Sequence, residues 1–247
     1  MITFRALASS SSGCCYLVKS GSGRPPILID PGLPIAKIKE QVQVTKLGFA
    51  LVSHHHLDHC RGAYALGAAG IPIVASAEAL IAMRLGKEAA RHRFWDLRAL
   101  SLVDNIQTRI DGWDVLGFNV KHDAPGSMGF LVSDGSGETL YYLTDSGYSP
   151  VVPHRPTVVA IEANHDPVII KDRMLADNVD RARWERTRRG HMSIDETVRT
   201  LQAMDLSECR AIHLLHLSDS HSDEDQFAER VRQATGVPTY VAAKRSA

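Results

Sequence analysis

The stretch that decides the fold is Leu51-Val52-Ser53-His54-His55-His56-Leu57-Asp58-His59. It overlaps the apolar run Phe49–Ser53, which indicates a short buried strand. It leads into the Ala- and Leu-rich run His59–Gly70, which is typical of a helix that ends near a glycine. Histidines and an aspartate therefore gather where a buried strand turns into a helix.

The spacing of these side chains has a chemical explanation. Residues two apart on an extended chain point to the same side, so His54 and His56 can reach one ion together. After the turn into the helix, Asp58 and His59 point to a neighbouring position, and the spacing predicts two adjacent metal ions. The alternative is a histidine-rich surface loop that binds metal by chance. An aspartate at this offset after a buried strand argues against it, and His55 has no assigned role.

A pair of metal ions needs more than four ligands, and three further candidates stand at the ends of predicted strands. They are His122 after Val115–Lys121, Asp145 after Thr139–Thr144, and His216 after Ile212–Leu215. Taken singly, each has an ordinary alternative as a capping, surface or turn residue. Together they supply two imidazoles and one carboxylate, and a carboxylate can bridge two metals.

Composition excludes several classes of protein. The chain has 247 residues with 44% hydrophobic and 23% charged, which is neither disordered nor fibrous. It holds 28 basic and 28 acidic residues, so a surface covered in basic patches is not expected, although a local one is possible. No apolar run approaches the ~18–20 residues of a membrane span, and the first residues do not resemble a signal peptide. Its four cysteines form no CxxC pair, which argues against a zinc ribbon or a disulfide framework and favours a reducing cytoplasm.

Short β-branched runs alternate with amphipathic runs along the chain. Strands are expected at Ile2–Ala6, Cys15–Lys19, Pro26–Asp30, Ile71–Ala75, Thr157–Ile161 and Thr239–Ala242, and several more between Ile106 and Leu143. Helices are expected at Pro34–Val44, Ser76–Gly86, Val168–Asp177, Ser193–Met204 and Asp223–Thr235. Two β-rich halves flanked by helices predict an α/β (α+β) protein, an αββα sandwich with two packed sheets and helices outside. We expect one domain over residues 1–247, since no linker divides the chain.

The ordered set of metal-binding candidates resembles the metallo-β-lactamase superfamily, whose fold is the αββα sandwich. This resemblance implies that His54, His56 and His122 bind one metal, that Asp58, His59 and His216 bind the other, and that Asp145 bridges them. It also implies that Asp30, in the segment Leu28–Gly32, supports the site by contacting a metal-binding residue and does not bind the metal itself.

Further segments resemble the YycJ/WalJ-like branch of that superfamily. They are Leu7–Cys15, His122–Pro125, Thr144–Tyr148, Ile161–Asp166, Gly190–Ser193 and His216–Ser218. The branch implies metal-dependent phosphodiester cleavage, with a 5′-to-3′ exonuclease activity on DNA. Two departures bear on the substrate and leave the metal chemistry intact. Cys14 stands where the opening segment usually has Asn, and the usual Asn pair is replaced around His221-Ser222.

The resemblance implies two divalent ions, Zn²⁺ or Mn²⁺, that share a hydroxide and offset charge on the phosphate. Asp58 and His191 are the catalytic candidates, and His191 resembles a histidine of RNase Z at the same point. His191 is expected to protonate the leaving oxygen or to contact phosphate. The alternative is that it only precedes Ser193, the N-cap of a helix. His165, Asp166 and Ser193 are candidates for support or substrate contact.

The substrate is suggested by a basic stretch, Arg181–Arg189, in which Arg186, Arg188 and Arg189 can contact phosphates. Its alternative is an ordinary solvated helix face. We therefore expect a nuclease whose partner is a nucleic acid or nucleotide phosphodiester, with no membrane partner and with a homodimer as the favoured assembly. Alternatives are a cyclic-nucleotide phosphodiesterase, an RNA-processing endonuclease, and a non-enzymatic metal-bearing regulator. β-Lactamase, glyoxalase and thiolesterase activities, which this fold also houses, are disfavoured because no substrate motif resembles theirs.

Overall fold

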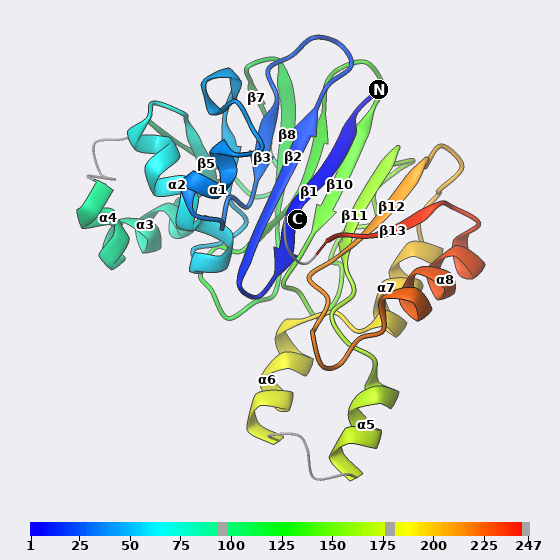
Figure 1. The fold of residues 1–247 in the computed structure, drawn as a ribbon. Helices are drawn as coiled ribbons and strands as arrows, with labels where there is room; N and C mark the ends of the chain where they lie inside the picture. The colour runs from blue at the N-terminus through cyan, green and yellow to red at the C-terminus, as the bar shows by residue number, and fades with distance from the viewer. Residues whose placement is uncertain (93–97, 176–180, 244–247) are drawn as a thin grey trace.

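The N-terminal half of the chain builds a six-stranded sheet (Figure 1). The computed structural model describes residues 1–92, 98–175 and 181–243. The first two hairpin pairings are antiparallel and the remaining ones are parallel. In sheet order the strands are β1 (Thr3–Ser10), β2 (Gly13–Lys19), β3 (Ile27–Ile29), β4 (Ala50–Leu51), β5 (Ile73–Ser76) and β6 (Ala99–Leu102).

The C-terminal half builds a seven-stranded sheet in which each strand lies beside the next one in the chain. The strands are β7 (Gln107–Ile110), β8 (Trp113–Asn119), β9 (Met128–Ser133), β10 (Thr139–Leu143), β11 (Val158–Glu162), β12 (Ala211–Leu215) and β13 (Thr239–Val241). The pairings from β7 to β10 are antiparallel and those from β10 to β13 are parallel. Because β10, β11 and β12 are parallel, their carboxyl ends reach the same edge of the sheet.

Helices cover the outer faces of the two sheets. The first sheet carries α1 (Ile35–Lys39), α2 (Leu57–Ala68), α3 (Ala77–Leu85) and α4 (Lys87–His92), and the second carries α7 (Ile194–Gln202) and α8 (Glu224–Thr235). A further pair, α5 (Pro167–Leu175) and α6 (Arg181–Gly190), extends away from the sheets in Figure 1. Within the described residues, no helix is long and apolar enough to span a membrane.

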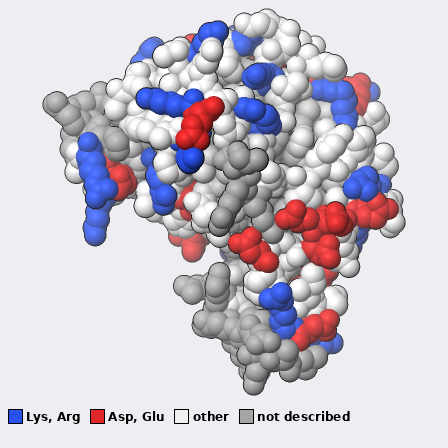
Figure 2. Space-filling view, viewed as in Figure 1, with Lys and Arg blue, Asp and Glu red and all other residues white. Residues whose placement is uncertain are grey.

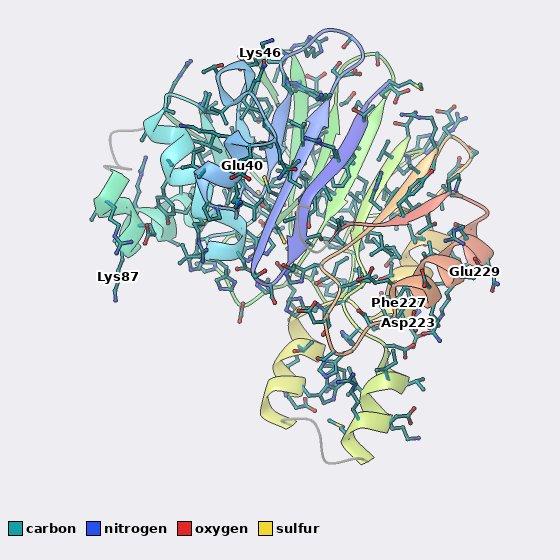
Figure 3. The ribbon with its side chains drawn as sticks, viewed as in Figure 1. Glu40, Lys46, Lys87, Asp223, Phe227 and Glu229 are labelled. Atoms are coloured by element: carbon teal, nitrogen blue, oxygen red, sulfur yellow. The ribbon has the colours of Figure 1, made fainter. Side chains whose placement is uncertain are left out.

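Three groups of buried residues follow from this layering. One fills the space between the sheets, with Tyr16, Trp113 and Phe130 among its large members. Another packs the first sheet against its helices, and the third packs the second sheet against α7 and α8, where Phe227 is fully buried (Figure 3). Burial on both faces of both sheets is the pattern of an αββα sandwich, so the predicted fold class is confirmed.

Several helix starts follow the capping rules. Ser76 accepts a hydrogen bond from the Ala79 amide at 3.0 Å, as the sequence predicts. Asp223 accepts one from the Gln226 amide at 3.0 Å and so caps α8 (Figure 3).

The expected helix Pro34–Val44 is wrong in extent. The chain forms only α1 and then the 3-10 turn Val44–Lys46. Strand β6 has no clear signal in the sequence, because it is an edge strand with mostly exposed side chains.

Candidate metal centre

Three residues of the centre lie one or two positions after a strand and take up a left-handed backbone conformation. Asp30 follows β3 with φ 48°, Asp145 follows β10 with φ 48°, and His216 follows β12 with φ 55°. This region disfavours side chains other than glycine, although Asp and His tolerate it better than most. Glycine at these positions would relieve the backbone strain. Aspartate or histidine in such a strained conformation is typical of functional sites.

The structure brings His54, His56 and His122 together. One ring nitrogen from each lies within 4.8 Å of the other two, and His122 Nε2 lies 3.4 Å from His56 Nδ1. The first two come from the turn between β4 and α2, and His122 comes from the loop after β8. Three converging imidazoles match the predicted ligand set of one metal.

A second group, Asp58, His59 and His216, lies beside the first. The Asp58 carboxylate is 3.6 Å from His59 Nε2 and 3.9 Å from His216 Nε2. The loop that carries Asp30 packs closely on this turn of α2, since a Cβ on Gly32 would lie 1.7 Å from the Asp58 carbonyl oxygen. Glycine at position 32 therefore allows the approach that positions these side chains.

Asp145 lies between the two groups. Its Oδ2 is 3.7 Å from His54 Nε2 and 2.7 Å from His59 Nε2, and its Oδ1 is 3.6 Å from His216 Nδ1. Burial opposes ionisation of this carboxyl group, but His216 and His59 hold the pKa of Asp145 well below its usual range. The structure thus brings all seven predicted ligands into one cluster, with an ionised carboxylate between the two groups.

The donor atoms fit divalent metal ions. Among the described residues, the buried atoms His54 Nε2, His122 Nδ1 and His216 Nε2 have no hydrogen-bond partner. Burial lowers the pKa of His54 and of His122, so both imidazoles are neutral and keep a lone pair for a metal. Buried polar atoms without a partner are costly unless a ligand satisfies them, and nitrogen with carboxylate donors suits Zn²⁺.

Asp30 lies directly behind His59, as the resemblance implies. It accepts hydrogen bonds from the Ser53 amide at 2.7 Å, the Ser53 hydroxyl at 2.7 Å and the Tyr142 hydroxyl at 2.6 Å. Its Oδ2 is also 2.8 Å from His59 Nδ1. This contact fixes the His59 ring with Nε2 toward the cluster, the usual task of a carboxylate behind a metal-binding histidine.

His191 joins the cluster with a partner that the sequence reasoning missed. Glu162 is fully buried at the end of β11, and its Oε1 lies 2.7 Å from His191 Nδ1. His191 Nδ1 is also 3.0 Å from Asp145 Oδ1. Burial alone would lower the pKa of His191, but the Glu162 and Asp145 carboxylates raise it to about 10. A lone glutamate ending the apolar run Val158–Ile161 was the available signal, since buried charges need a partner.

His165, Asp166 and Ser193 flank the cluster without joining the ligand set. His165 is buried with its ring at 5.0 Å from that of Trp184, and burial lowers its pKa to about 4. Asp166 accepts a hydrogen bond from the Val168 amide at 2.7 Å at the start of α5. Ser193 caps α7 by accepting from the Glu196 amide at 3.2 Å. All three contacts are explained by packing and capping, and a substrate role for these residues stays a prediction.

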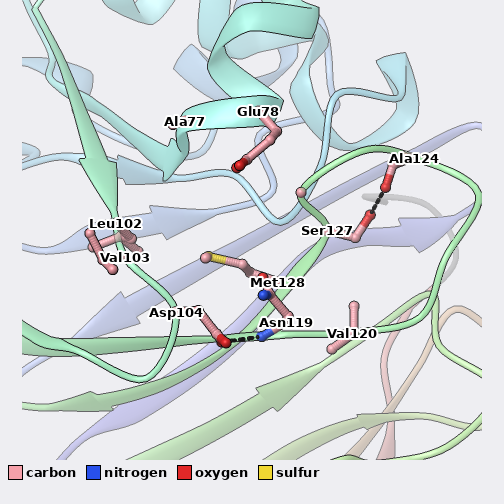
Figure 4. A pocket seen from close by; sticks show the side chains of 11 residues that line it. Ala77, Glu78, Leu102, Val103, Asp104, Asn119, Val120, Ala124, Ser127 and Met128 are labelled. Atoms are coloured by element: carbon pink, nitrogen blue, oxygen red, sulfur yellow. Dashed lines mark hydrogen bonds between the residues drawn. The ribbon is translucent and has the colours of Figure 1, made fainter.

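Two cavities open beside the cluster. One of about 270 Å³ is lined by Lys121, His122, Asp123, Arg189 and Gly190. The other, of about 140 Å³, is lined by the polar side chains Ser11, Asn164, Thr187, His191, His216, Ser218, Asp219, Ser220 and His221, together with Leu217. A further cavity of about 480 Å³ lies on the other side of the 122–127 loop, where Glu78 and Asp104 are its only charged lining groups (Figure 4).

The predicted phosphate-binding arginines differ in their surroundings. Arg189 lines the cavity beside His122, whereas Arg188 donates to Glu185 at 3.2 Å. Arg189 also lies 3.7 Å from Glu185. The side chain of Arg186 is outside the described part of the structure. The face seen in Figure 2 mixes basic and acidic side chains, with acidic ones gathered over α7 and α8, so it presents no broad basic surface.

Comparison with known proteins agrees with this geometry. The family model described as "Beta-lactamase superfamily domain" matches residues 26–216. No curated protein matches the chain in sequence. The solved structure of the metallo-β-lactamase fold protein YhfI from Bacillus subtilis is 17% identical, with a TM-score of 0.73, 98% of this chain covered and 97% of that one.

Two further solved structures share the fold. Zn²⁺-bound PqqB from Methylobacterium extorquens is 14% identical with a TM-score of 0.72, and 98% of each chain is covered. The short form of human tRNase Z is 15% identical with a TM-score of 0.62, covering 89% of this chain and 93% of that one. At such identities the likeness shows the fold alone, and the narrower YycJ/WalJ-like resemblance stays a prediction. With the family model spanning most of the chain, the protein belongs to the β-lactamase superfamily and has the metallo-β-lactamase fold.

Proposed function

We propose that the protein is a metal-dependent phosphodiester hydrolase with a dinuclear centre, and that it acts as a nuclease. The observation that carries this proposal is the placement of His191 against the predicted bridging carboxylate. Its Nδ1 lies 3.0 Å from Asp145 Oδ1, and the Glu162 and Asp145 carboxylates raise its pKa to about 10. A centre with seven ligands and an adjacent protonated imidazole suits a reaction in which a charged oxygen leaves.

The residues have distinct tasks in this reaction. His54, His56 and His122 would hold one ion, Asp58, His59 and His216 the other, and Asp145 both. The ions would lower the pKa of water and offset negative charge on the phosphate. His191 Nδ1 faces the two carboxylates, so its Nε2 is the atom that can give a proton to the leaving oxygen. Glu162 keeps that imidazole protonated and oriented through the 2.7 Å contact.

A polymeric substrate is supported by what flanks the centre. Lys121 and Arg189 line the cavity beside His122, and serine, threonine and histidine side chains line the cavity beside His216. A strand crossing the centre would place phosphates against cations on one side and hydroxyl donors on the other. The 5′-to-3′ exonuclease activity on DNA is proposed from the sequence resemblance, and the tRNase Z fold neighbour adds an RNA-processing endonuclease as an alternative.

A small-molecule phosphodiesterase, for example on cyclic nucleotides, is the second candidate. It is favoured by the pairing of Arg188 and Arg189 with Glu185, which leaves little free positive charge for a long backbone. The zero formal net charge is consistent with it.

One substrate panel separates the candidates. The protein, loaded with Zn²⁺ or Mn²⁺, is incubated with 5′-labelled and 3′-labelled DNA, with a structured RNA and with cyclic mononucleotides. We expect stepwise shortening of DNA from its 5′ end. Hydrolysis of cyclic nucleotides with no polymer cleavage would replace the nuclease by the second candidate, and internal cuts in RNA alone would replace it by the endonuclease.

A further inference from the structure

The Cys14 thiol lies against the second group of the candidate metal centre. Cys14 sits on β2, opposite Ser9 of β1, near the tip of the first hairpin. Its sulfur lies within 4.8 Å of a ring nitrogen of His59 and of His216, which also lie that close to each other. The side chain is fully buried, and its hydrogen-bond acceptor is the Ser10 carbonyl at a long 3.5 Å.

The hairpin is fastened to the opposite sheet at this point. The Ser9 hydroxyl accepts a hydrogen bond from the His216 amide at 2.9 Å and pairs with the Tyr16 hydroxyl at 2.7 Å. These bonds hold the end of β12 on the strand pair that carries Cys14. The position of the sulfur relative to His216 is therefore set by the bond between the Ser9 hydroxyl and the His216 amide, which ligand binding does not need to rearrange.

Independent atoms point to a ligand at the same place. His216 Nε2 is buried, and among the described residues it has no hydrogen-bond partner, while His59 Nε2 is buried with the Asp145 carboxylate at 2.7 Å. His59 is turned toward this point by Asp30 at its other nitrogen, at 2.8 Å. Asp58 completes the group at 3.6 Å from His59 Nε2 and 3.9 Å from His216 Nε2.

We propose that Cys14 is a sulfur ligand of the metal held by Asp58, His59 and His216. On binding, the thiol releases its proton to solvent, and the resulting thiolate gives a lone pair to the ion. The set then offers two nitrogens, one sulfur and carboxylate oxygen, which suits Zn²⁺, Co²⁺ or Cd²⁺ and disfavours Mn²⁺ at this position. The inference rests on the proposed metal centre and does not depend on the substrate.

The neighbouring cysteine supplies a matched control. Successive residues of a strand face opposite sides, so Cys15 packs between the first sheet and its helices, while Cys14 faces the space between the sheets. Both thiols are fully buried on the same strand. Cys14→Ser and Cys15→Ser thus make the same chemical change on the two sides of the sheet.

The experiment is the absorption spectrum of the full-length protein carrying two equivalents of Co²⁺. Thiolate bound to Co²⁺ gives an intense near-ultraviolet charge-transfer band, whereas nitrogen and oxygen ligands do not. We expect this band in the unaltered protein, its loss in Cys14→Ser, and its retention in Cys15→Ser. A melting curve on each variant checks the fold, and Cys14→Ala replaces Cys14→Ser if the buried hydroxyl prevents folding.

Each outcome decides the matter. A Co²⁺-loaded protein without the band, or a band that survives in Cys14→Ser, would overturn the proposal even if the unaltered protein cleaves phosphodiesters. A band that depends on Cys14 in a protein that cleaves no phosphodiester would support the sulfur ligand and refute the proposed activity.

Discussion

The carboxylate of Glu162 and the imidazole of His191 lie 2.7 Å apart, one at the end of β11 and the other after α6. Glu162 also accepts hydrogen bonds from the Ser146 amide at 3.2 Å and the Met192 amide at 3.1 Å. Backbone groups of two separate loops therefore hold the carboxylate in place before any substrate binds. A histidine held in this way beside the predicted metal ligands is arranged to move a proton, and a purely structural metal site has no need of one.

Glu162→Gln tests the pairing of these two residues. Without the negative charge, the pKa of His191 should fall from about 10, because Asp145 is then the one carboxylate left to oppose the effect of burial. A proton donor must be protonated, so the alkaline limb of the pH–rate profile should move to lower pH, and kcat should fall roughly tenfold to a hundredfold. Glu138→Gln is the matched control. Glu138 forms an ion pair with Arg210, with 2.6 Å between the charged groups, and this pair lies away from the centre. A profile that Glu162→Gln leaves unchanged would remove Glu162 from this role.

Asp145→Asn tests the bridging carboxylate. Losing a ligand shared by both positions should reduce metal content below two equivalents, as measured by elemental analysis after gel filtration. The rate of hydrolysis should fall roughly a thousandfold, because the activation free energy rises by several kcal/mol. Asp104→Asn, which alters an exposed carboxyl group in the cavity of Figure 4, should retain full metal content. Unaltered metal content in Asp145→Asn would contradict the assigned bridge.

Tyr142→Phe tests the support behind His59. It removes the hydroxyl that donates to Asp30 at 2.6 Å, and Tyr141→Phe removes one that pairs with Ser149. Both should lower the free energy of unfolding by about 1 kcal/mol. Only Tyr142→Phe should also weaken metal affinity, by roughly tenfold, because Asp30 orients His59. Competition with a chromogenic chelator measures the metal affinity. Equal affinities in the two variants would contradict the idea that Tyr142 acts on His59 through Asp30.

The surroundings of His213 predict that the folded protein loses stability in acid, and this effect does not depend on bound metal. Its ring lies 4.9 Å from Phe4 and 5.6 Å from Tyr240, and burial lowers its pKa from 6.5 to about 4. The unfolded chain takes up this proton at a higher pH than the folded one. Stability is therefore full above pH 6.5 and is lost as the pH falls toward 4. At pH 5 the loss from this residue is about 2 kcal/mol.

His213→Phe should remove that part of the acid sensitivity, measured as the difference in urea unfolding free energy between pH 7 and pH 5. His154→Gln changes an exposed histidine and serves as the control. If His213→Phe loses as much stability between the two pH values as the unaltered protein, the buried imidazole is not the titrating group.

The sequence was most informative where chemistry and chain geometry coincide. The segment from His54 to His59 predicted ligands because spacing along a strand and into a helix dictates direction. His122, Asp145 and His216 were found as polar residues after apolar strands, and the structure places them together because β8, β10 and β12 run in the same direction and end at one edge of the sheet. Glu162 was passed over because its partner His191 lies 29 residues away, and pairing at that distance is set by packing.

Boundaries and surface roles were less predictable. The helix expected over Pro34–Val44 ends at Lys39, and the chain then forms a 3-10 turn at Val44–Lys46, so apolar spacing alone set its end too late. Asp166 carried a motif resemblance, yet its carboxylate is engaged by the Val168 amide of the next helix. Whether a polar residue at a helix start caps the helix or meets a substrate depends on a few ångströms that composition and spacing do not encode.

The most direct test of the account is a titration of metal-free protein with Zn²⁺ or Mn²⁺ while hydrolysis of a chromogenic phosphodiester is followed. The account predicts activity that rises as the second equivalent of metal binds, disappears with a chelator and is absent in Asp145→Asn. A protein that binds two equivalents and hydrolyses no phosphodiester, either small or polymeric, would contradict it.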